Sequence, residues 1–258
     1  MGDVKKLSEK EIKKHIKSGT LVRVFKEIDS TNNEAKRLSE SGFFARSLIA
    51  ALSQTAGRGR LGRSFYSPES TGLYFTVTFP ITFPLEDITL ITPAAAVAVH
   101  RTLRALTEKE LFIKWVNDIY CGDKKVCGIL AEVLSAPETN IPKSVAVGIG
   151  INLFTSDFPD ELANIAASLS LDSANPSLIA ANIANELFAF AENLSKREFI
   201  PEYRKYSYVT GKEIFFIQGE ETTNAHALDI DDDGGLTVLL ENGEKATLRG
   251  GEISVRVK

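Results

Sequence analysis

The sequence predicts an α+β fold with one large mixed domain and a small β domain after it. The chain has 258 residues, 43% of them hydrophobic, which is enough for one large core and a small second one. Up to about residue 210, strand-like runs are mixed with runs of helical periodicity. After that point the sequence contains only short strand-like runs separated by turn dipeptides. We therefore predict domains at 1–210 and 211–258.

Apolar periodicity and turn residues predict the order of elements in the first domain. Asn175-Pro176 is a typical helix start, because proline is favoured at the first helical position. Thr31 and Glu34 have the spacing of a capping box, although a helix start can also bind a polar ligand. The expected helices are 8–18, 31–40, 88–106 and 176–194, and the expected strands are 21–25, 48–52, 73–79, 111–120, 126–134 and 145–153.

The last 50 or so residues predict a separate small β-barrel. Asp233-Gly234-Gly235 and Asn242-Gly243 are strong hairpin signals between apolar runs. Deletion of this segment is expected to leave a folded catalytic core. Its expected strands are 213–218, 225–230, 236–240, 245–248 and 253–257.

Residues 54–63, the glycine-arginine loop, stand out as a candidate anion site. Residues 57–63 contain three glycines and three arginines, which combine a pliant backbone with planar cationic donors. We expect the loop to be mobile without ligand, because unneutralised arginines repel one another. The spacing also matches a dinucleotide fingerprint, but no helix follows it and the first acid near the required distance is Glu86. A solvated basic turn is the alternative.

Two further apolar runs carry unusual residues. The run 111–120 includes Lys114, Asn117 and Asp118, polar groups that need partners if they are buried. The alternative is an edge strand with a solvated Lys114. In 145–153, alternating glycines remove side chains from one face, as a flat ligand would require.

Composition excludes several classes of function. The net charge of -4 argues against a dominant nucleic-acid-binding face. No run is long enough to cross a bilayer, and the first residues lack the apolar segment of a signal peptide, so we expect a cytoplasmic protein that does not bind membranes. The sequence shows no zinc, P-loop or Ser-His-Asp pattern.

Taken together, the motifs resemble the biotin protein ligases. The resemblance rests on ordered motifs across nearly the whole chain: Asp29-Ser30-Thr31-Asn32, the loop Gln54 to Arg63, Lys114-Trp115-x-Asn117-Asp118, Lys125-x-x-Gly128-Ile129-Leu130, Gly148-Ile149-Gly150-Ile151-Asn152 and Gly251-Glu252-Ile253-Ser254. It implies a central mixed sheet flanked by helices, like that of class II aminoacyl-tRNA synthetases, and an SH3-like C-terminal barrel.

The resemblance also implies roles for individual residues. Catalytic roles fall to Lys114, at the reacting carboxylate and α-phosphate, and to Arg58 and Arg60, which close over biotin and the nucleotide phosphates. The implied biotin-binding residues are Ser30, Thr31, Asn32, Gln54, Arg58, Gly59, Arg60, Lys114, Trp115 and Gly128. The implied ATP-binding residues are Arg58, Arg60, Arg63, Phe65, Asn117 and Asn152, and no residue is assigned to a metal.

Three departures from the family pattern are visible. Val116 stands where the family usually has proline, which affects the backbone that aims Lys114. Phe65 stands where some members have a tryptophan over the adenine, so we expect stacking with less area. The residues before Leu21 are too few for the helix-turn-helix domain of repressor-type members, so we expect no DNA binding.

The implied activity joins biotin to protein at the expense of ATP. Biotin is activated as biotinyl-5′-adenylate and transferred to a lysine of a biotin carboxyl carrier protein, such as that of acetyl-CoA carboxylase, with Mg²⁺ accompanying ATP. A homodimer is possible, with no nucleic-acid partner. Two alternatives remain open: a lipoate or octanoate ligase or transferase of the same core fold, and a non-catalytic regulator that senses biotin.

Overall fold

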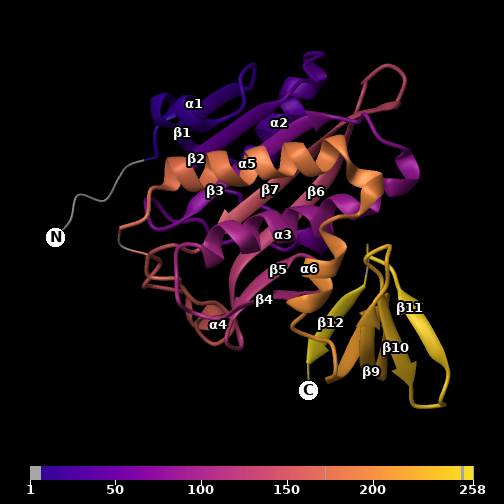
Figure 1. The fold of residues 1–258 in the computed structure, drawn as a ribbon. Helices are drawn as coiled ribbons and strands as arrows, with labels where there is room; N and C mark the ends of the chain where they lie inside the picture. Colours follow the sequence, from indigo (N-terminus) through magenta and orange to yellow (C-terminus); the bar gives the residue numbers. More distant parts are fainter. Residues whose placement is uncertain (1–6, 172, 251–252, 258) are drawn as a thin grey trace.

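The computed structural model describes residues 7–171, 173–250 and 253–257, so the motif residues Gly251 and Glu252 lie outside the described part (Figure 1). Its centre is a seven-stranded sheet in the order β1-β2-β3-β7-β6-β5-β4. The sheet is mixed, as expected, because β1 and β2 are parallel and the other described pairs are antiparallel. The strands are β1 Leu21–Ile28, β2 Ser47–Gln54, β3 Leu73–Pro80, β4 Leu111–Lys114, β5 Asp118–Cys121, β6 Lys124–Ser135 and β7 Pro142–Ile151.

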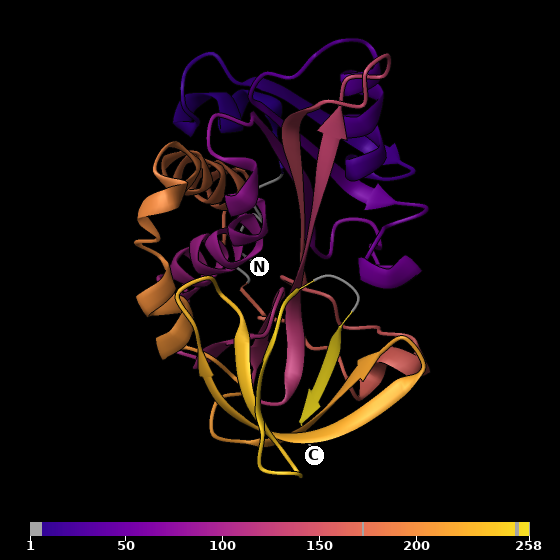
Figure 2. The same cartoon turned by 90° about the vertical axis from the view of Figure 1, so that its right-hand side faces the viewer.

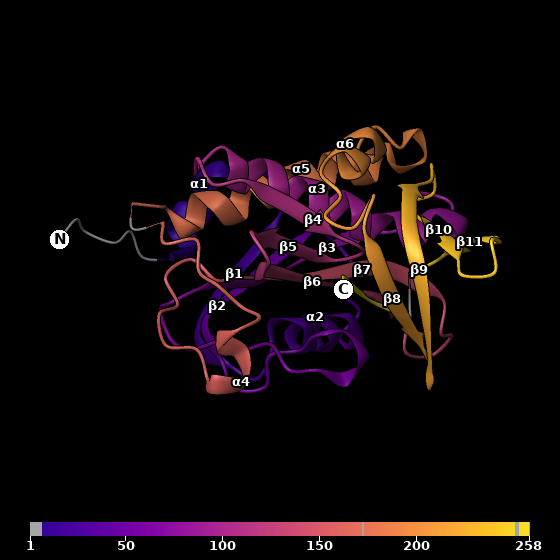
Figure 3. The same ribbon diagram turned by 90° about the horizontal axis from the view of Figure 1, so that it is seen from below.

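Helices cover both faces of this sheet unequally. Figure 3 shows α3, α5 and α6 on one face and α2 on the other. Most side chains of α3 and α5 are buried, since these two helices pack on each other as well as on the sheet. The α-helices are α1 Glu9–His15, α2 Thr31–Glu40, α3 Ile91–Arg104, α4 Asp160–Ala163, α5 Pro176–Glu192 and α6 Ile200–Lys205, and the 3₁₀ turns are Arg60–Gly62, Leu85–Leu90 and Leu194–Lys196.

The C-terminal segment forms a second, five-stranded antiparallel sheet in the order β11-β10-β9-β8-β12. All five predicted strands are present: β8 Glu213–Gln218, β9 Glu221–Ile230, β10 Leu236–Leu240, β11 Lys245–Leu248 and β12 Ser254–Val257. The sheet packs beside one end of the large sheet (Figure 2), and its buried side chains join those of the first sheet in one apolar cluster. The Arg204 guanidinium donates to the Ile230 carbonyl at 2.6 Å and strengthens the contact. The predicted boundary at 210 and 211 falls just before β8; whether the two parts fold independently stays a prediction.

The prediction of one strand over 111–120 is wrong. The chain forms a hairpin of β4 and β5 with Trp115, Val116 and Asn117 in the turn, and the Trp115–Val116 peptide is cis. Trp115 and Val116 are both buried, which a strand facing one core would not allow for consecutive residues. The Trp115 indole N–H instead donates to the Gly234 carbonyl of the second sheet at 3.0 Å. A tertiary contact therefore sets the position of this turn.

The expected capping box at Thr31 is also wrong. Ser30 is the N-cap of α2 and makes no side-chain cap, and Thr31 is already the first helical residue. The Thr31 hydroxyl lies 3.2 Å from Gln54 Oε1 and 2.8 Å from Thr76 Oγ1. Its contacts are therefore with neighbouring strands and not with its own helix.

Candidate functional site

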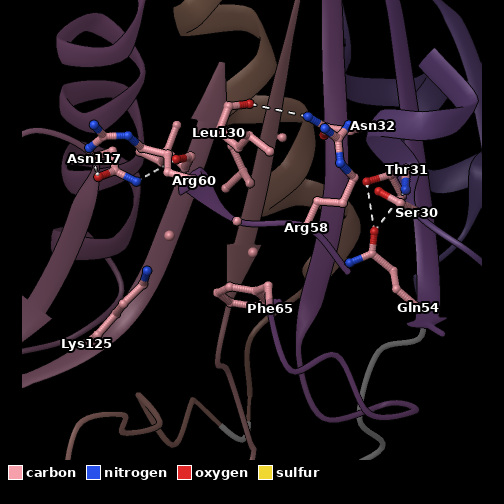
Figure 4. Close-up of a pocket in the computed structure, with 16 residues that line it drawn as sticks. Ser30, Thr31, Asn32, Gln54, Arg58, Arg60, Phe65, Asn117, Lys125 and Leu130 are labelled. Atoms are coloured by element: carbon pink, nitrogen blue, oxygen red, sulfur yellow. Dashed lines mark hydrogen bonds between the residues drawn. The ribbon is translucent and has the colours of Figure 1, made fainter. Parts of the chain in front are cut away.

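A cavity of about 430 Å³ lies where the start of α2, the glycine-arginine loop and the strands β6 and β7 meet (Figure 4). Ten of the residues predicted for the site line it: Ser30, Thr31, Asn32, Gln54, Arg58, Gly59, Arg60, Phe65, Asn117 and Gly128. The fold thus brings together motifs that lie up to about a hundred residues apart in sequence.

One side of the cavity is a buried polar cluster. Ser30 and Thr31 are almost fully buried at the N-terminus of α2. The Thr31 backbone N–H donates to Gln54 Oε1 at 2.9 Å, which fixes the orientation of this amide. Gln54 Nε2 then donates to the Ser67 hydroxyl at 3.0 Å. These groups are held in place before any ligand arrives, as a hydrogen-bonding site requires.

The loop arginines are held by protein partners. Arg58 makes a bidentate pair with Glu132, at 2.8 and 2.9 Å. Arg60 donates to Asn117 Oδ1 at 3.0 Å and to the Ile253 carbonyl at 3.3 Å, and burial lowers its pKa. The expectation of unneutralised arginines is therefore wrong for Arg58, since Glu132 supplies a counter-charge.

The glycines of β6 and β7 leave room above the sheet, but the protein's own groups use it. Gly128 and Gly150 are paired across the two strands. A Cβ at Gly150 would lie 2.4 Å from the Phe65 ring, and a Cβ at Gly148 would lie 2.0 Å from the Asn32 amide oxygen. The Phe65 ring therefore occupies space over Gly150 that a side chain at that position would fill.

The other end of the cavity is cationic. Lys125 lines it and pairs with Asp118 at 2.8 Å. Lys114 lies deeper, only 7% exposed, and donates to the Tyr120 hydroxyl at 2.9 Å. Burial, with smaller contributions from Arg256 and Lys125, lowers the pKa of Lys114 to about 8. This end would stabilise negative charge that arrives or develops there.

Four of the predicted site residues do not line the cavity: Lys114, Arg63, Trp115 and Asn152. Arg63 is exposed, and Trp115 is turned toward the second sheet. Asn152 is buried and donates to the Ala167 carbonyl at 3.2 Å, so it fixes the segment after β7. The ligand-binding roles of these four residues stay predictions.

Six lining residues were not among the predicted site residues: Lys125, Ile129, Leu130, Gly148, Ile149 and Gly150. Lys125 is the charged one of the six. Lys125 begins the motif Lys125-x-x-Gly128-Ile129-Leu130, and the family resemblance assigns it no role. An exposed lysine at a turn and a lysine aimed into a cavity look alike in sequence. The signal that could have found it is its spacing of three from Gly128, because the Lys125 Nζ occupies the space next to that glycine.

The comparisons with known proteins agree with this geometry. Residues 24–152 match the biotin/lipoate A/B protein ligase family. The chain belongs to that family. Residues 209–256 match the biotin protein ligase C terminal domain.

Relatives and solved structures of this family resemble the chain along most of its length. The bifunctional ligase/repressor BirA of Bacillus spizizenii is 34% identical, over 93% of this chain and 77% of that protein. The biotin--[acetyl-CoA-carboxylase] ligase of Mycobacterium tuberculosis is 29% identical over 78% of this chain and 79% of its own. The Aquifex aeolicus biotin protein ligase in complex with biotin and ATP has a TM-score of 0.75 at 29% identity, covering 92% of this chain and 99% of that one.

The described residues contain neither a metal-binding cluster nor a membrane-spanning helix. Across the residues that the structure describes, no group of three or more His, Cys, Asp or Glu could hold a metal ion. No helix in the described part is long and apolar enough to span a bilayer.

Proposed function

We propose that this chain is an ATP-dependent biotin protein ligase. The biotin carboxylate attacks the α-phosphorus of ATP, which forms biotinyl-5′-adenylate and releases pyrophosphate. A lysine ε-amine of a biotin carboxyl carrier protein then attacks the mixed anhydride, which forms an amide and releases AMP. The membership of the family and the biotin- and ATP-bound neighbour support this reaction.

One observation carries the proposal: a single cavity has a buried neutral polar cluster at one side and a cationic end at the other. Biotin has a neutral ureido ring that needs hydrogen bonds and a carboxylate that must meet a triphosphate. Thr31 and Gln54 suit the ring, since a buried polar group without a partner costs about 1–3 kcal/mol. Arg60 and Lys125 suit the carboxylate and the phosphates, because bringing two anions together requires cationic groups between them.

The remaining roles follow from position. Ser30 and Gly59 would contact the ureido side, and Phe65 would stack against the flat part of the ligand. Lys114 does not line the cavity and would act on the reacting oxygens through its charge, within electrostatic reach of Asp118 and Lys125. Arg58 would bind phosphate only by leaving Glu132, so we assign it to loop closure first.

Mg²⁺ is proposed as the companion of ATP. Magnesium in such sites is bound through one or two carboxylates together with phosphate oxygens and water, so no cage of protein ligands is needed. Asp118 fits this demand: its Oδ1 is buried, makes no hydrogen bond and pairs only with Lys125 among the described groups. When bound, the ion would neutralise charge on the phosphates.

Two alternatives make different predictions. A lipoate or octanoate enzyme of the same fold would offer Thr31 and Gln54 a substrate without ureido groups, which would leave these buried groups without ligand partners. A biotin-sensing regulator would have no use for the cationic end beyond binding a carboxylate. The cavity therefore favours biotin activation.

The direct test is transfer. The chain is incubated with ATP, Mg²⁺, labelled biotin and a biotin carboxyl carrier protein, beside a carrier whose acceptor lysine is replaced by arginine. The proposal predicts ATP-dependent labelling of the first carrier alone. Binding of biotin without labelling of either carrier would support the sensor, and labelling only with lipoate would support the first alternative.

A further inference from the structure

The turn between β4 and β5 is held from outside the cavity. Its two buried residues, Trp115 and Val116, each bond to another element. The Trp115 indole N–H donates to the Gly234 carbonyl, and the Val116 carbonyl accepts from the Tyr203 hydroxyl at 2.9 Å. Tyr203 lies in α6, does not line the cavity and belongs to none of the sequence motifs. A residue outside the cavity thus holds the turn that carries Asn117.

The sequence of α6 directs this side chain inward. Ile200 and Tyr203 are three residues apart, so they lie on one face of the helix, and both are almost fully buried. The helix packs on α3. Burial raises the pKa of Tyr203, so the phenol stays neutral and keeps its proton. A buried phenol needs an acceptor for that proton, and the Val116 carbonyl supplies it.

The held carbonyl leads directly to the cavity. Val116 and Asn117 share one planar peptide unit, so fixing the Val116 carbonyl also fixes the backbone N–H of Asn117. The Asn117 side chain is fixed by β6, because its Nδ2 donates to the Ile129 carbonyl at 2.7 Å. Its Oδ1 then accepts from Arg60 at 3.0 Å (Figure 4). The Arg60 guanidinium also lies within electrostatic reach of Tyr203.

The strand that carries Lys114 is held in a different way. The Ile113 N–H donates to the Tyr206 carbonyl at 2.7 Å, and the Tyr208 N–H donates to the Ile113 carbonyl at 2.8 Å. These are main-chain bonds, which the Tyr203 hydroxyl does not make. Loss of that hydroxyl should therefore loosen the turn and the loop more than it loosens Lys114.

We propose that Tyr203 is a positioning residue for the glycine-arginine loop: it fixes the peptide before Asn117, which holds Arg60 at the cavity and slows the escape of biotinyl-adenylate. The inference rests on the proposed function, because the adenylate is the intermediate of that reaction. Tyr203 touches neither the ligand nor the reacting atoms and acts through Asn117. Its hydroxyl should therefore affect the release of the adenylate more than its synthesis.

The test measures synthesis and release separately. The chain is loaded with labelled biotinyl-adenylate, excess unlabelled adenylate is added, and the label that leaves the protein is followed. Pyrophosphate exchange at saturating biotin and ATP reports synthesis. Tyr203→Phe removes the hydroxyl and keeps the ring, so the core should stay packed. Release should be about three- to tenfold faster, the effect of one uncharged hydrogen bond, and exchange should change by less than about twofold.

Tyr206→Phe is the matched control. Tyr206 directly follows α6, and its hydroxyl accepts from Arg104, an exposed residue of α3 that does not line the cavity. The variant loses a phenol hydroxyl from the same segment and should release the adenylate at the parent rate. Equally fast release in Tyr203→Phe and Tyr206→Phe would show a general loosening of α6 and would overturn the proposal.

Two further variants test the route from Tyr203 to the loop. In Arg60→Gly the connection is already lost, so adding Tyr203→Phe should change release by less than about twofold. Asn117→Ala removes the acceptor that Arg60 meets and should speed release at least as much as Tyr203→Phe.

Three results would overturn this route. Tyr203→Phe could release the adenylate at the parent rate, or it could speed release equally with and without Arg60. Release at the parent rate in Asn117→Ala would overturn the proposal even if Tyr203→Phe did not fold. A parent chain that formed no adenylate would instead refute the proposed function.

Discussion

At the scale of single residues, Lys114 is the group whose environment departs most from its sequence context. It lies in the edge strand β4, where a lysine would ordinarily reach solvent, yet it is almost fully buried. The chain from Tyr206 to Tyr208 covers that edge by bonding to Ile113 on both sides. Among the described residues, the hydrogen-bond partner of this buried ammonium is the Tyr120 hydroxyl, which carries no counter-charge. Such a costly arrangement is typical of a functional lysine.

Removing this charge should reduce adenylation strongly. Lys114→Met keeps the length of the side chain, so the fold should be retained while pyrophosphate exchange falls by about 10² to 10³, the scale of one lost electrostatic group. Lys124→Met, ten residues on and bonded to a surface carbonyl, is the control. Exchange at the parent rate in Lys114→Met would mean that the lysine serves only the structure.

The lowered pKa predicts how activity depends on pH. Since the pKa of Lys114 is about 8, its charge is lost as the pH rises through 8, and kcat/KM for exchange should fall there. Lys114→Arg should keep its charge and remove this fall. If kcat/KM fell in the same way above pH 8 in the parent and in Lys114→Arg, the titration would belong to another group.

The same shift predicts a stability effect of opposite sign. The folded-state pKa lies below the ordinary value of 10.5, so between pH 8 and 10.5 the unfolded chain binds the extra proton. The free energy of unfolding should therefore rise with pH in this window, relative to Lys114→Met. Denaturant titrations at pH 7.5, 9 and 10, which span about two and a half pH units, would detect this rise in the free energy of unfolding.

At the scale of elements, the glycine-arginine loop is held by its guanidinium groups. Arg60 joins the loop to Asn117 in the β4–β5 turn and to the Ile253 carbonyl just before β12. The loop thus connects parts of both sheets above the cavity. Closure of this kind would keep water from a mixed anhydride.

Arg60→Gly should let the intermediate escape. The variant removes this connection and adds flexibility, so released adenylate should acylate lysines of an unrelated protein more strongly than the parent does. Leu61→Gly is the matched control: it adds a glycine to the same loop, at an exposed position whose φ of 57° suits glycine, without removing a guanidinium. Bystander labelling at the parent level while adenylate is still made would contradict the retention role.

Sequence patterns predicted the elements better than the site. Periodicity and turn dipeptides gave the second sheet and the start of α5, where Asn175 caps the helix as expected, because these signals act over a few residues. The break at Trp115 depends on a carbonyl 119 residues away, and the partners of Arg58 and Asn32 come from β6. Such pairings depend on tertiary packing and have no local pattern.

At the scale of the whole molecule, the second sheet packs against the first and buries side chains of its β4–β5 turn. Trp115 and Val116 are buried where the two sheets meet, and Arg204 of α6 bonds to β9. One apolar cluster includes residues of both sheets. The two sheets therefore contribute to a common interface, and Arg60, which lines the cavity, donates to the Ile253 carbonyl just before β12.

Truncation after Thr210 should weaken the fold without abolishing it. Exposure of Trp115 and Val116 should cost at least about 2 kcal/mol. For a chain of this size that lowers the melting temperature by about 4–8 °C. Thermal unfolding followed by circular dichroism would measure the shift. Complete loss of cooperative unfolding in the fragment would show that the parts cannot fold separately.

Pyrophosphate exchange is the most direct test of whether one cavity activates biotin with ATP. Labelled pyrophosphate is supplied with ATP and Mg²⁺, and biotin, lipoate or octanoate is added separately. We expect label in ATP with biotin, none above background with the other two acids, and loss of the signal in Lys114→Met. Exchange with lipoate or octanoate but not with biotin, or no exchange with any acid by a chain that still binds biotin, would contradict it.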